Sequence, residues 1–194
     1  IHWLGTSSAC GELMTLETRN DRTLFFDMLP ITVSSESGLK VRLKLFTVPG
    51  QVMHNATRRL VLQGADGVAF IADSQRSEAE ANQESFRNLK QNLKEIGINP
   101  GNIPIVIQFN KRDLEDIRSD EDLEDIGKQT QQQIYKAVAT RGYGVMQTLH
   151  GLIRETWNKL EEQHGIEKKF GIDPTRFIHE IEAKLKHDPT RQER

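Results

Sequence analysis

An apolar stretch from residue 103 to residue 109 ends abruptly in four polar residues, Asn110, Lys111, Arg112 and Asp113. A nearly continuous apolar run of this length is typical of a strand buried on both faces of a parallel sheet. Such sheets carry helices on their faces and bind their ligands at the carboxyl ends of the strands. The sequence therefore predicts an α/β fold, with four polar residues where such a fold binds its ligand.

The side chains of this polar segment suit a guanine base. The Asp113 carboxylate can accept two parallel hydrogen bonds from ring N1 and the exocyclic amine of guanine, whereas adenine offers no such pair of donors. The aliphatic stem of Lys111 can lie along the base, and the Asn110 amide can tie neighbouring loops together. An ATP-dependent enzyme is accordingly disfavoured. The alternative, ordinary polar residues in a loop after a strand, stays open on four residues alone.

Composition narrows the class of protein. With 194 residues, 36% of them hydrophobic, the chain can bury one sizeable core, so we predict one domain followed by a tail. A formal net charge of −2 gives no basic footprint for nucleic-acid binding, and the single Cys10 cannot form an internal disulfide. No apolar stretch approaches the ~20 residues that cross a bilayer. We expect a cytoplasmic protein without a transmembrane segment.

Strand-like and helix-like segments alternate along the chain. We predict strands at residues 23–33, 40–48, 67–72, 103–109 and 134–139 from their apolar runs and alternation. We predict helices at residues 56–63, 77–96 and 145–164. The acidic segment 119–128 is expected to be a mostly solvated helix. A capping box of Ser77 and Glu80 is expected to start the second of these helices. The first two strands form a hairpin, and we expect all the strands to form one mostly parallel sheet with helices on both faces and one antiparallel strand from the hairpin.

A further amphipathic helix is expected beyond residue 165. Asp173 is a suitable N-cap, Pro174 suits the first helical position, and Asp188-Pro189 ends the helix. This divides the chain into a domain at residues 1–164 and a helical extension at residues 165–194. The extension either docks on its own domain, which we favour, or binds a partner.

Two further loops carry residues suited to phosphate chemistry. Gly50 lets a backbone N–H approach a phosphate oxygen, and the Gln51 amide can orient an attacking water. Before the first strand, the Thr23 hydroxyl is a suitable Mg²⁺ ligand, and the Arg22 guanidinium can neutralise charge on a transferring phosphoryl group. Taken alone, each segment is also explained as an ordinary turn or loop.

The order of these segments, with two longer strings, resembles the Ras-like small GTPases and, within them, the bacterial MglA group. The strings are Asp-Arg-Thr-Leu-Phe-Phe-Asp at residues 21–27 and Thr-Val-Pro-Gly-Gln at residues 47–51. The resemblance covers about residues 12–160 and leaves the tail outside it. It implies a Ras-like P-loop NTPase fold that binds GTP and GDP and hydrolyses GTP with Mg²⁺.

The resemblance also implies roles for single residues. Thr23 binds Mg²⁺ and senses the γ-phosphate, Gln51 aligns the water, and Arg22 acts as an arginine finger within the same chain. Such a finger contributes ~10³ to 10⁵ in rate in GTPases that use one. The residues expected to bind the nucleotide fall into two groups. Thr23 and Gly50 lie on the phosphate side. The base-reading residues are Asn110, Lys111, Asp113, Ala137, Val138 and Ala139.

Two departures from the general small-GTPase pattern stand out. Thr47 stands where most small GTPases have an aspartate, a change that the MglA group shares. No Walker A pattern is present, since neither Gly5 nor Gly11 is followed by Lys-Ser or Lys-Thr. In the family that loop and the strand before it precede the position where this chain begins. We therefore expect an N-terminally incomplete sequence, in which two central strand edges lack their shared neighbour.

The expected function is that of a molecular switch. The resemblance implies control of bacterial cell polarity or gliding motility, recruitment to a cell pole, and regulation by a Roadblock-domain activator of the MglB type, with polarity or motility effectors as further partners. The alternative is a catalytically inactive GTPase-fold protein that binds a Roadblock-like partner without turnover.

Overall fold

The computed structural model describes residues 12–16, 26–34, 40–48, 55–171 and 173–185. The chain divides into two compact units, residues 1–61 with 166–194 and residues 62–165. Each unit has a three-stranded sheet of its own. Strands and helices are mixed as an α/β fold requires, in agreement with the predicted fold class.

The first unit contains an antiparallel sheet in the order β1-β2-β3. β2 and β3 pair along their length, with Ile31 opposite Leu43, so the predicted hairpin is confirmed. Arg42 and Lys44 of β3 are exposed, while the apolar residues that alternate with them are half-buried, as the alternation predicts. β1 is too short for a periodicity to reveal it. The strands are β1 (Met14–Leu16), β2 (Phe26–Ser34) and β3 (Lys40–Thr47).

The last helix of the chain packs within the same unit. Phe177, Ile178 and Ile181 of this helix, α6, are buried, and α6 contacts β2. The Asp173 carboxylate accepts a hydrogen bond from the Arg176 N–H at 2.8 Å, which confirms the predicted N-cap. The structure thus agrees with a docked extension. The helices outside the second unit are α1 (Asn55–Leu62), which crosses the unit boundary, α5 (Ile166–Phe170), which we did not predict, and α6 (Pro174–Leu185).

The second unit is built on a parallel sheet in the order β4-β5-β6. β5 lies in the middle and is buried along nearly its whole length, as its apolar run predicts. Asp73, the last residue of β4, is directly opposite Asn110, the last residue of β5. The carboxyl ends of the strands therefore meet at one edge. The strands are β4 (Val68–Asp73), β5 (Ile105–Asn110) and β6 (Gln133–Lys136).

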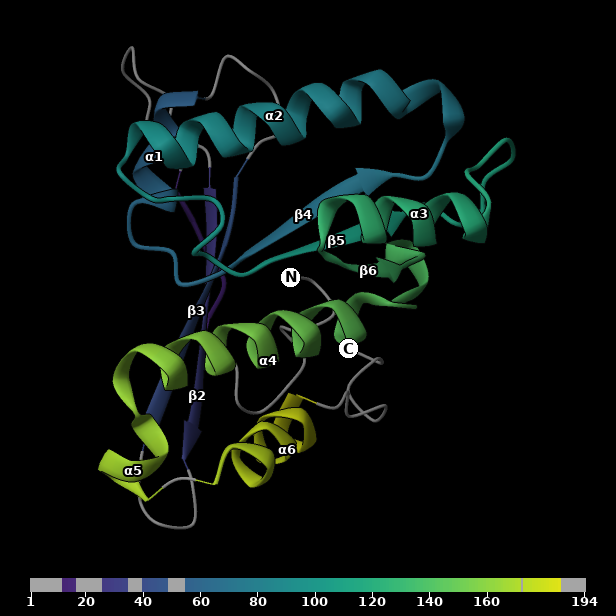
Figure 1. Cartoon of the computed structure of the whole chain (residues 1–194). Helices are drawn as coiled ribbons and strands as arrows, with labels where there is room; N and C mark the ends of the chain where they lie inside the picture. The colour runs from purple at the N-terminus through teal and green to yellow at the C-terminus, as the bar shows by residue number, and fades with distance from the viewer. Residues whose placement is uncertain (1–11, 17–25, 35–39, 49–54, 172, 186–194) are drawn as a thin grey trace. The chain divides into compact units, whose positions relative to one another are not determined.

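Helices cover both faces of this parallel sheet (Figure 1). On one face Ile107 and Phe109 of β5 pack with Leu123 of α3. On the other face the side chain of Gln108 accepts a hydrogen bond from the Thr148 hydroxyl of α4 at 2.7 Å. Alternate residues of β5 thus face opposite sides of the sheet, one side covered by α2 and α3 and the other by α4, as expected for a β-strand. The helices are α2 (Ala79–Glu95), α3 (Asp120–Thr130) and α4 (Val145–His164).

β3 and β4 each have one edge without a partner among the described strands. β3 pairs only with β2, and β4 pairs only with β5. No described strand pairs with the other side of either one.

The predicted capping box of Ser77 and Glu80 is wrong. A short 3₁₀-helix, η2 (Arg76–Glu78), precedes α2, and Glu78 at the N-cap makes no side-chain capping bond. The reason lies upstream, because the Glu78 N–H donates to the Gln75 carbonyl at 3.1 Å and the turn therefore starts before Ser77. A complete capping box occurs instead at the start of α3.

The fifth predicted strand is shorter than expected. β6 ends at Lys136, and Ala137 continues its direction by donating its N–H to the Phe109 carbonyl. Val138 then pairs with Tyr143 instead of β5, and a 3₁₀-helix, η3 (Ala139–Arg141), begins directly after it. Residues 137–139 are therefore a loop at the carboxyl end of the strand.

Candidate functional site

Two predicted base-reading segments lie side by side at the carboxyl edge of the parallel sheet. The side-chain oxygen of Asn110 accepts a hydrogen bond from the Ala139 N–H at 2.9 Å. The Arg112 N–H donates to the Ala137 carbonyl at 3.0 Å. The segments come from the ends of β5 and β6, which are neighbours in the sheet. The structure thus brings together Asn110 to Asp113 and Ala137 to Ala139.

Lys111 is held in an uncommon backbone conformation. Its φ of 62° is in the left-handed region, which residues with a Cβ rarely adopt. Its ammonium forms an ion pair with the Asp73 carboxylate at the end of β4, at 2.6 Å. The hydrogen bond to Asp73 raises the pKa of Lys111, and the charge of Asp73 adds to the effect. Lys111 therefore links the carboxyl ends of two neighbouring strands.

Asp73 is fixed from several directions. Its N–H donates to the Asn82 side-chain oxygen at 3.1 Å, and the Asn82 amide donates to the Asp73 carbonyl at 2.9 Å. One carboxylate oxygen accepts from the Gln75 N–H at 3.0 Å, which leaves the other for Lys111. We did not single out Asp73 from the sequence. The available signal was an acidic residue at the end of a buried strand, the same signal that drew attention to Asn110.

Asp113 presents an exposed carboxylate at the same edge of the sheet. Within the described part of the chain, this carboxylate forms no hydrogen bond or ion pair, so its acceptor positions are open to a ligand. An ionised carboxylate accepts hydrogen bonds only, and it can accept two in parallel from a planar donor pair. The N1 and amine donors of guanine are such a pair.

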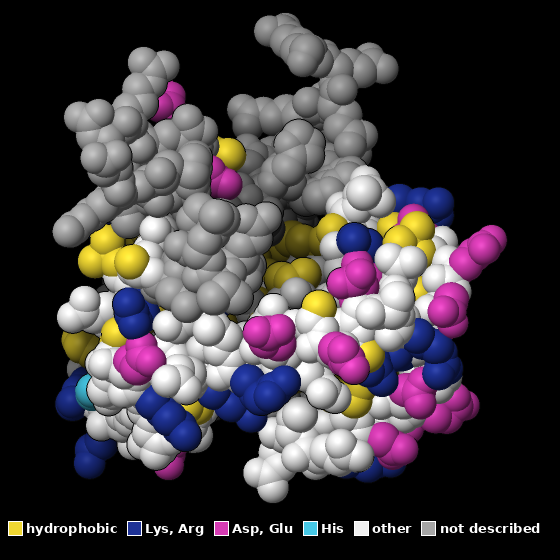
Figure 2. All heavy atoms as spheres, turned by 90° about the horizontal axis from the view of Figure 1, so that it is seen from above, with side chains coloured by type: hydrophobic (Ala, Val, Ile, Leu, Met, Phe, Trp, Pro, Cys, Tyr) yellow, Lys and Arg dark blue, Asp and Glu magenta, His cyan; other side chains and the backbone are white. Residues whose placement is uncertain are grey.

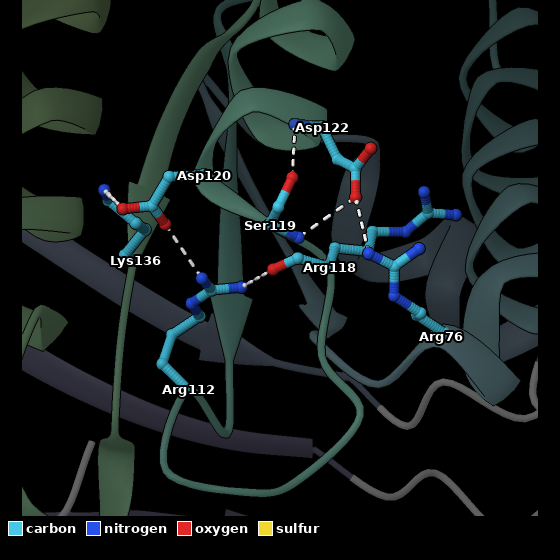
Figure 3. Close-up of polar contacts among 7 residues, drawn as sticks. All are labelled: Arg76, Arg112, Arg118, Ser119, Asp120, Asp122 and Lys136. Atoms are coloured by element: carbon cyan, nitrogen blue, oxygen red, sulfur yellow. Dashed lines mark hydrogen bonds and ion pairs between the residues drawn. The ribbon is translucent and has the colours of Figure 1, made fainter.

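The loop that carries Asp113 is closed by its neighbour Arg112 (Figure 3). The Arg112 guanidinium donates to the Arg118 carbonyl at 2.7 Å, and its other end forms an ion pair with Asp120 at 2.8 Å. Asp120 also pairs with Lys136 of β6 at 2.8 Å. The hydrogen bond from Lys136, assisted by Arg112, lowers the pKa of Asp120. We did not predict this network from the sequence.

A second carboxylate holds the far end of the loop (Figure 3). Asp122 accepts from the Ser119 N–H at 3.0 Å, and the Ser119 hydroxyl accepts from the Asp122 N–H at 3.1 Å. Asp122 also pairs with Arg76 at 3.3 Å. The Ser119 hydrogen bond chiefly lowers the pKa of Asp122. The loop from residue 111 to residue 119 is thus tied to α3 at both ends.

An open cavity of about 410 Å³ lies between α2 and α3, away from the base-reading residues. Phe70, Phe86 and Phe109 contribute to its apolar lining, and Asp122 and Asp125 are among its polar residues. None of the predicted nucleotide-binding residues in the described part of the chain lines it.

The outer surface of the described residues carries both signs of charge. The exposed side of α2 includes Glu84, Arg87 and Lys90, and the view from above shows basic and acidic side chains interleaved (Figure 2). A nucleic-acid binder instead gathers basic residues on one face. Among the described helices, none has both the length and the apolarity to cross a membrane.

The predicted catalytic residues Arg22 and Gln51, the predicted magnesium ligand Thr23 and the predicted phosphate-contacting Gly50 lie outside the described residues. Thr47 next to them is described. Its hydroxyl donates to the Asp27 carboxylate at 3.1 Å and accepts from the Asp27 N–H at 3.3 Å. Thr47 thus cross-links β2 and β3.

Comparison with known proteins adds one close relative. No family model matches the chain. The chain is 45% identical over 152 residues to the mutual gliding-motility protein MglA of Myxococcus xanthus (strain DK1622), an alignment that covers 78% of this chain and 78% of the relative.

Proposed function

We propose a function on one premise: the chain belongs to the MglA family of small GTPases. On that premise the protein is a molecular switch that binds guanine nucleotides and hydrolyses GTP to GDP. The observation that carries the proposal is the hydrogen bond between Asn110 and Ala139, which joins the two base-reading segments. The free carboxylate of Asp113 at the same edge supports guanine as the base.

Base recognition divides among a few groups. Asp113 accepts hydrogen bonds from N1 and the exocyclic amine of guanine. Residues 137–139 lie beside it, where the family places a backbone contact to the base carbonyl. In this structure their N–H groups donate to Phe109, Tyr143 and Asn110, so this contact requires one of those bonds to be exchanged for the base. The stem of Lys111 lies along the base while its ammonium stays on Asp73, because the four-carbon chain separates the two functions. Asn110 holds the loops together and does not read the base itself.

In this proposal, the residues that hydrolyse GTP come from the two loops earlier in the chain, around Thr23 and around Gln51. Gln51 orients the attacking water, and Arg22 neutralises charge that develops on the γ-phosphoryl group. The Gly50 N–H approaches a γ-phosphate oxygen. The Thr23 hydroxyl suits Mg²⁺, which, when bound, neutralises phosphate charge during transfer.

The name of the relative supports a proposal for the cellular role. We propose that this protein controls gliding motility or cell polarity from the cytoplasm, with recruitment to a cell pole. Its partners in this proposal are a Roadblock-domain activator of the MglB type and motility effectors. Residues 1–164 form the GTPase domain of the proposal, and residues 165–194 form its helical extension.

Isothermal titration of the full-length protein with GDP and ADP in the presence of Mg²⁺ tests the binding step. We expect micromolar or tighter binding of GDP and much weaker binding of ADP, because ADP has no donor pair for Asp113. Equal affinity for the two nucleotides, or no binding of GDP, would overturn the proposal.

Phosphate release from GTP tests the chemistry. Arg22→Ala is expected to lower the rate constant by ~10³-fold or more if the finger acts as in other GTPases, and Gln51→Ala is also expected to lower it. Arg87→Ala, on the exposed surface of α2, is the control and should hydrolyse GTP at the wild-type rate. Tight GDP binding without any phosphate release would favour the alternative, a GTPase-fold interaction protein without turnover.

A further inference from the structure

The first residue of α3 connects both base-reading segments. One oxygen of the Asp120 carboxylate pairs with Arg112, between Lys111 and Asp113, at 2.8 Å. Its other oxygen pairs with Lys136, the residue before Ala137, at 2.8 Å. Each basic partner is thus next in sequence to a residue expected to contact guanine.

We propose that Asp120 is a positioning residue for guanine recognition: by binding Arg112 and Lys136 at once, it fixes the two base-reading segments relative to each other. The inference rests on the proposed function, since it assigns a role in the same site. Asp120 does not touch the base in this role. It acts through the two basic side chains.

Asp120 can affect base recognition because no side chain among the described residues holds the Asp113 carboxylate. Within the described part of the chain its carboxylate has no hydrogen-bond or ion-pair partner, so its direction depends on the backbone on either side. On one side, Arg112 is held by its N–H on the Ala137 carbonyl and by its guanidinium. On the other side, the Leu114 N–H closes a turn onto the Lys111 carbonyl at 3.2 Å. Releasing the guanidinium therefore loosens the residue next to the base-reading carboxylate.

The two pairs differ in strength. The Arg112 side chain is only 13% exposed, whereas the Lys136 side chain is 47% exposed. Water screens an exposed pair more strongly than a covered one. Loss of Arg112 from Asp120 should therefore matter more than loss of Lys136.

The start of α3 does not depend on Asp120. Ser119 and Asp122 form the capping box, and neither bond involves the Asp120 side chain. Asp120→Asn removes one negative charge from the first turn. Glu121→Gln removes the same charge from the same turn, so both variants lose a similar favourable interaction with the helix dipole. Glu121 is exposed and is a matched control.

The experiment measures affinity and dissociation rate for GDP and for inosine diphosphate, with the full-length protein. Inosine lacks the exocyclic amine, so the preference for GDP reports how well the Asp113 carboxylate is aligned. For Asp120→Asn we expect GDP to dissociate roughly three to ten times faster, in line with the loss of a partly exposed charged pair. The preference for GDP over inosine diphosphate should fall as well.

Each outcome bears on the inference. Glu121→Gln should keep the wild-type dissociation rate and base preference, and Lys136→Gln should fall between Glu121→Gln and Asp120→Asn. Equal behaviour of Asp120→Asn and Glu121→Gln would overturn the inference. So would a drop in melting temperature of Asp120→Asn with an unchanged base preference, because that result indicates a structural role only. If the wild-type protein itself shows no preference for GDP, the proposed function fails instead.

Discussion

The side-chain oxygen of Asn110, at the end of β5, accepts a hydrogen bond from the Ala139 N–H, 29 residues later in the chain. The bond joins two loops that leave neighbouring strands, and the same edge of the sheet carries Asp113. Since an amide and a carboxylate both offer an acceptor here, the bond can be tested without changing the size of the side chain.

Asn110→Ala should weaken both the fold and nucleotide binding. Loss of the acceptor is expected to lower the free energy of unfolding by roughly 1 kcal/mol, measured by urea denaturation. Asn110→Asp keeps an acceptor for the Ala139 N–H and should recover most of that loss. If both variants unfold at the same urea concentration as the wild type, the bond does not stabilise the loops.

Asp113→Asn should change the preferred base from guanine to xanthine. Xanthine carries a carbonyl where guanine carries the amine, and an asparagine amide can donate to it while its oxygen accepts from N1. We expect GDP to bind about 100-fold more weakly, because two charge-assisted hydrogen bonds are lost. Titration with xanthosine diphosphate and GDP measures the exchange. Unchanged preference for guanine would mean that another residue reads the base.

The ion pair of Lys111 and Asp73 predicts a pH-dependent contribution to stability. Burial alone would raise the pKa of Asp73, but the Gln75 N–H and the Lys111 ammonium together lower it below its ordinary value. A carboxylate with a lowered folded-state pKa stabilises the fold above the unfolded pKa of about 3.9. That contribution is lost as pH falls through the lowered pKa.

Lys111→Gln removes the ammonium and tests this dependence. The variant should melt at a lower temperature than the wild type near pH 7, and the difference should shrink as the pH is lowered through about 4 and below. Lys94→Gln is the control, because Lys94 forms no ion pair within the described residues. A difference between wild type and Lys111→Gln that stays constant over this pH range would exclude the pair as its source.

Local pattern was enough to predict much of the fold. The buried run before Asn110 and the alternation of residues 40–48 each specify a strand through side-chain periodicity, so β5 and β3 were expected. The candidate site was predicted in part for the same reason, because Asn110 to Asp113 follow a buried strand directly. Elements as short as β1 and α5 contain too few residues for a period to show.

Contacts between distant residues could not be predicted in this way. Ser77 and Glu80 have the spacing of a capping box, yet the chain is held by a bridge between Gln75 and Ile117 and its turn starts earlier, at Gln75. Asp120 lies in a segment whose composition indicates only a solvated acidic helix. Its two partners lie before α3 and after it in the sequence, and only the folded chain brings the three together.

Gly151 of α4 is a packing position rather than a weak point of the helix. A Cβ at this position would overlap the hydroxyl and ring atoms of Tyr135 in β6. Gly151→Ala should therefore lower the free energy of unfolding by roughly 1–3 kcal/mol, although alanine is the better helix former. In a Tyr135→Ala background the same change should be neutral or stabilising. A destabilisation of equal size in both backgrounds would mean that Tyr135 is not the obstacle.

Gln131 offers the opposite case, a position where glycine should improve stability. It caps the end of α3 with a φ of 57°, in the left-handed region that glycine adopts without steric cost. Gln131→Gly is expected to raise the free energy of unfolding by about 0.5–1 kcal/mol, since a residue with a Cβ pays roughly that much or more in this conformation. Gln129→Gly, two residues earlier inside the helix, is the matched control and should lower the free energy of unfolding by about 1 kcal/mol. Urea denaturation of both variants separates the backbone effect from the loss of the side chain, because each variant loses the same glutamine. Destabilisation of similar size at both positions would show that the left-handed conformation at Gln131 costs nothing.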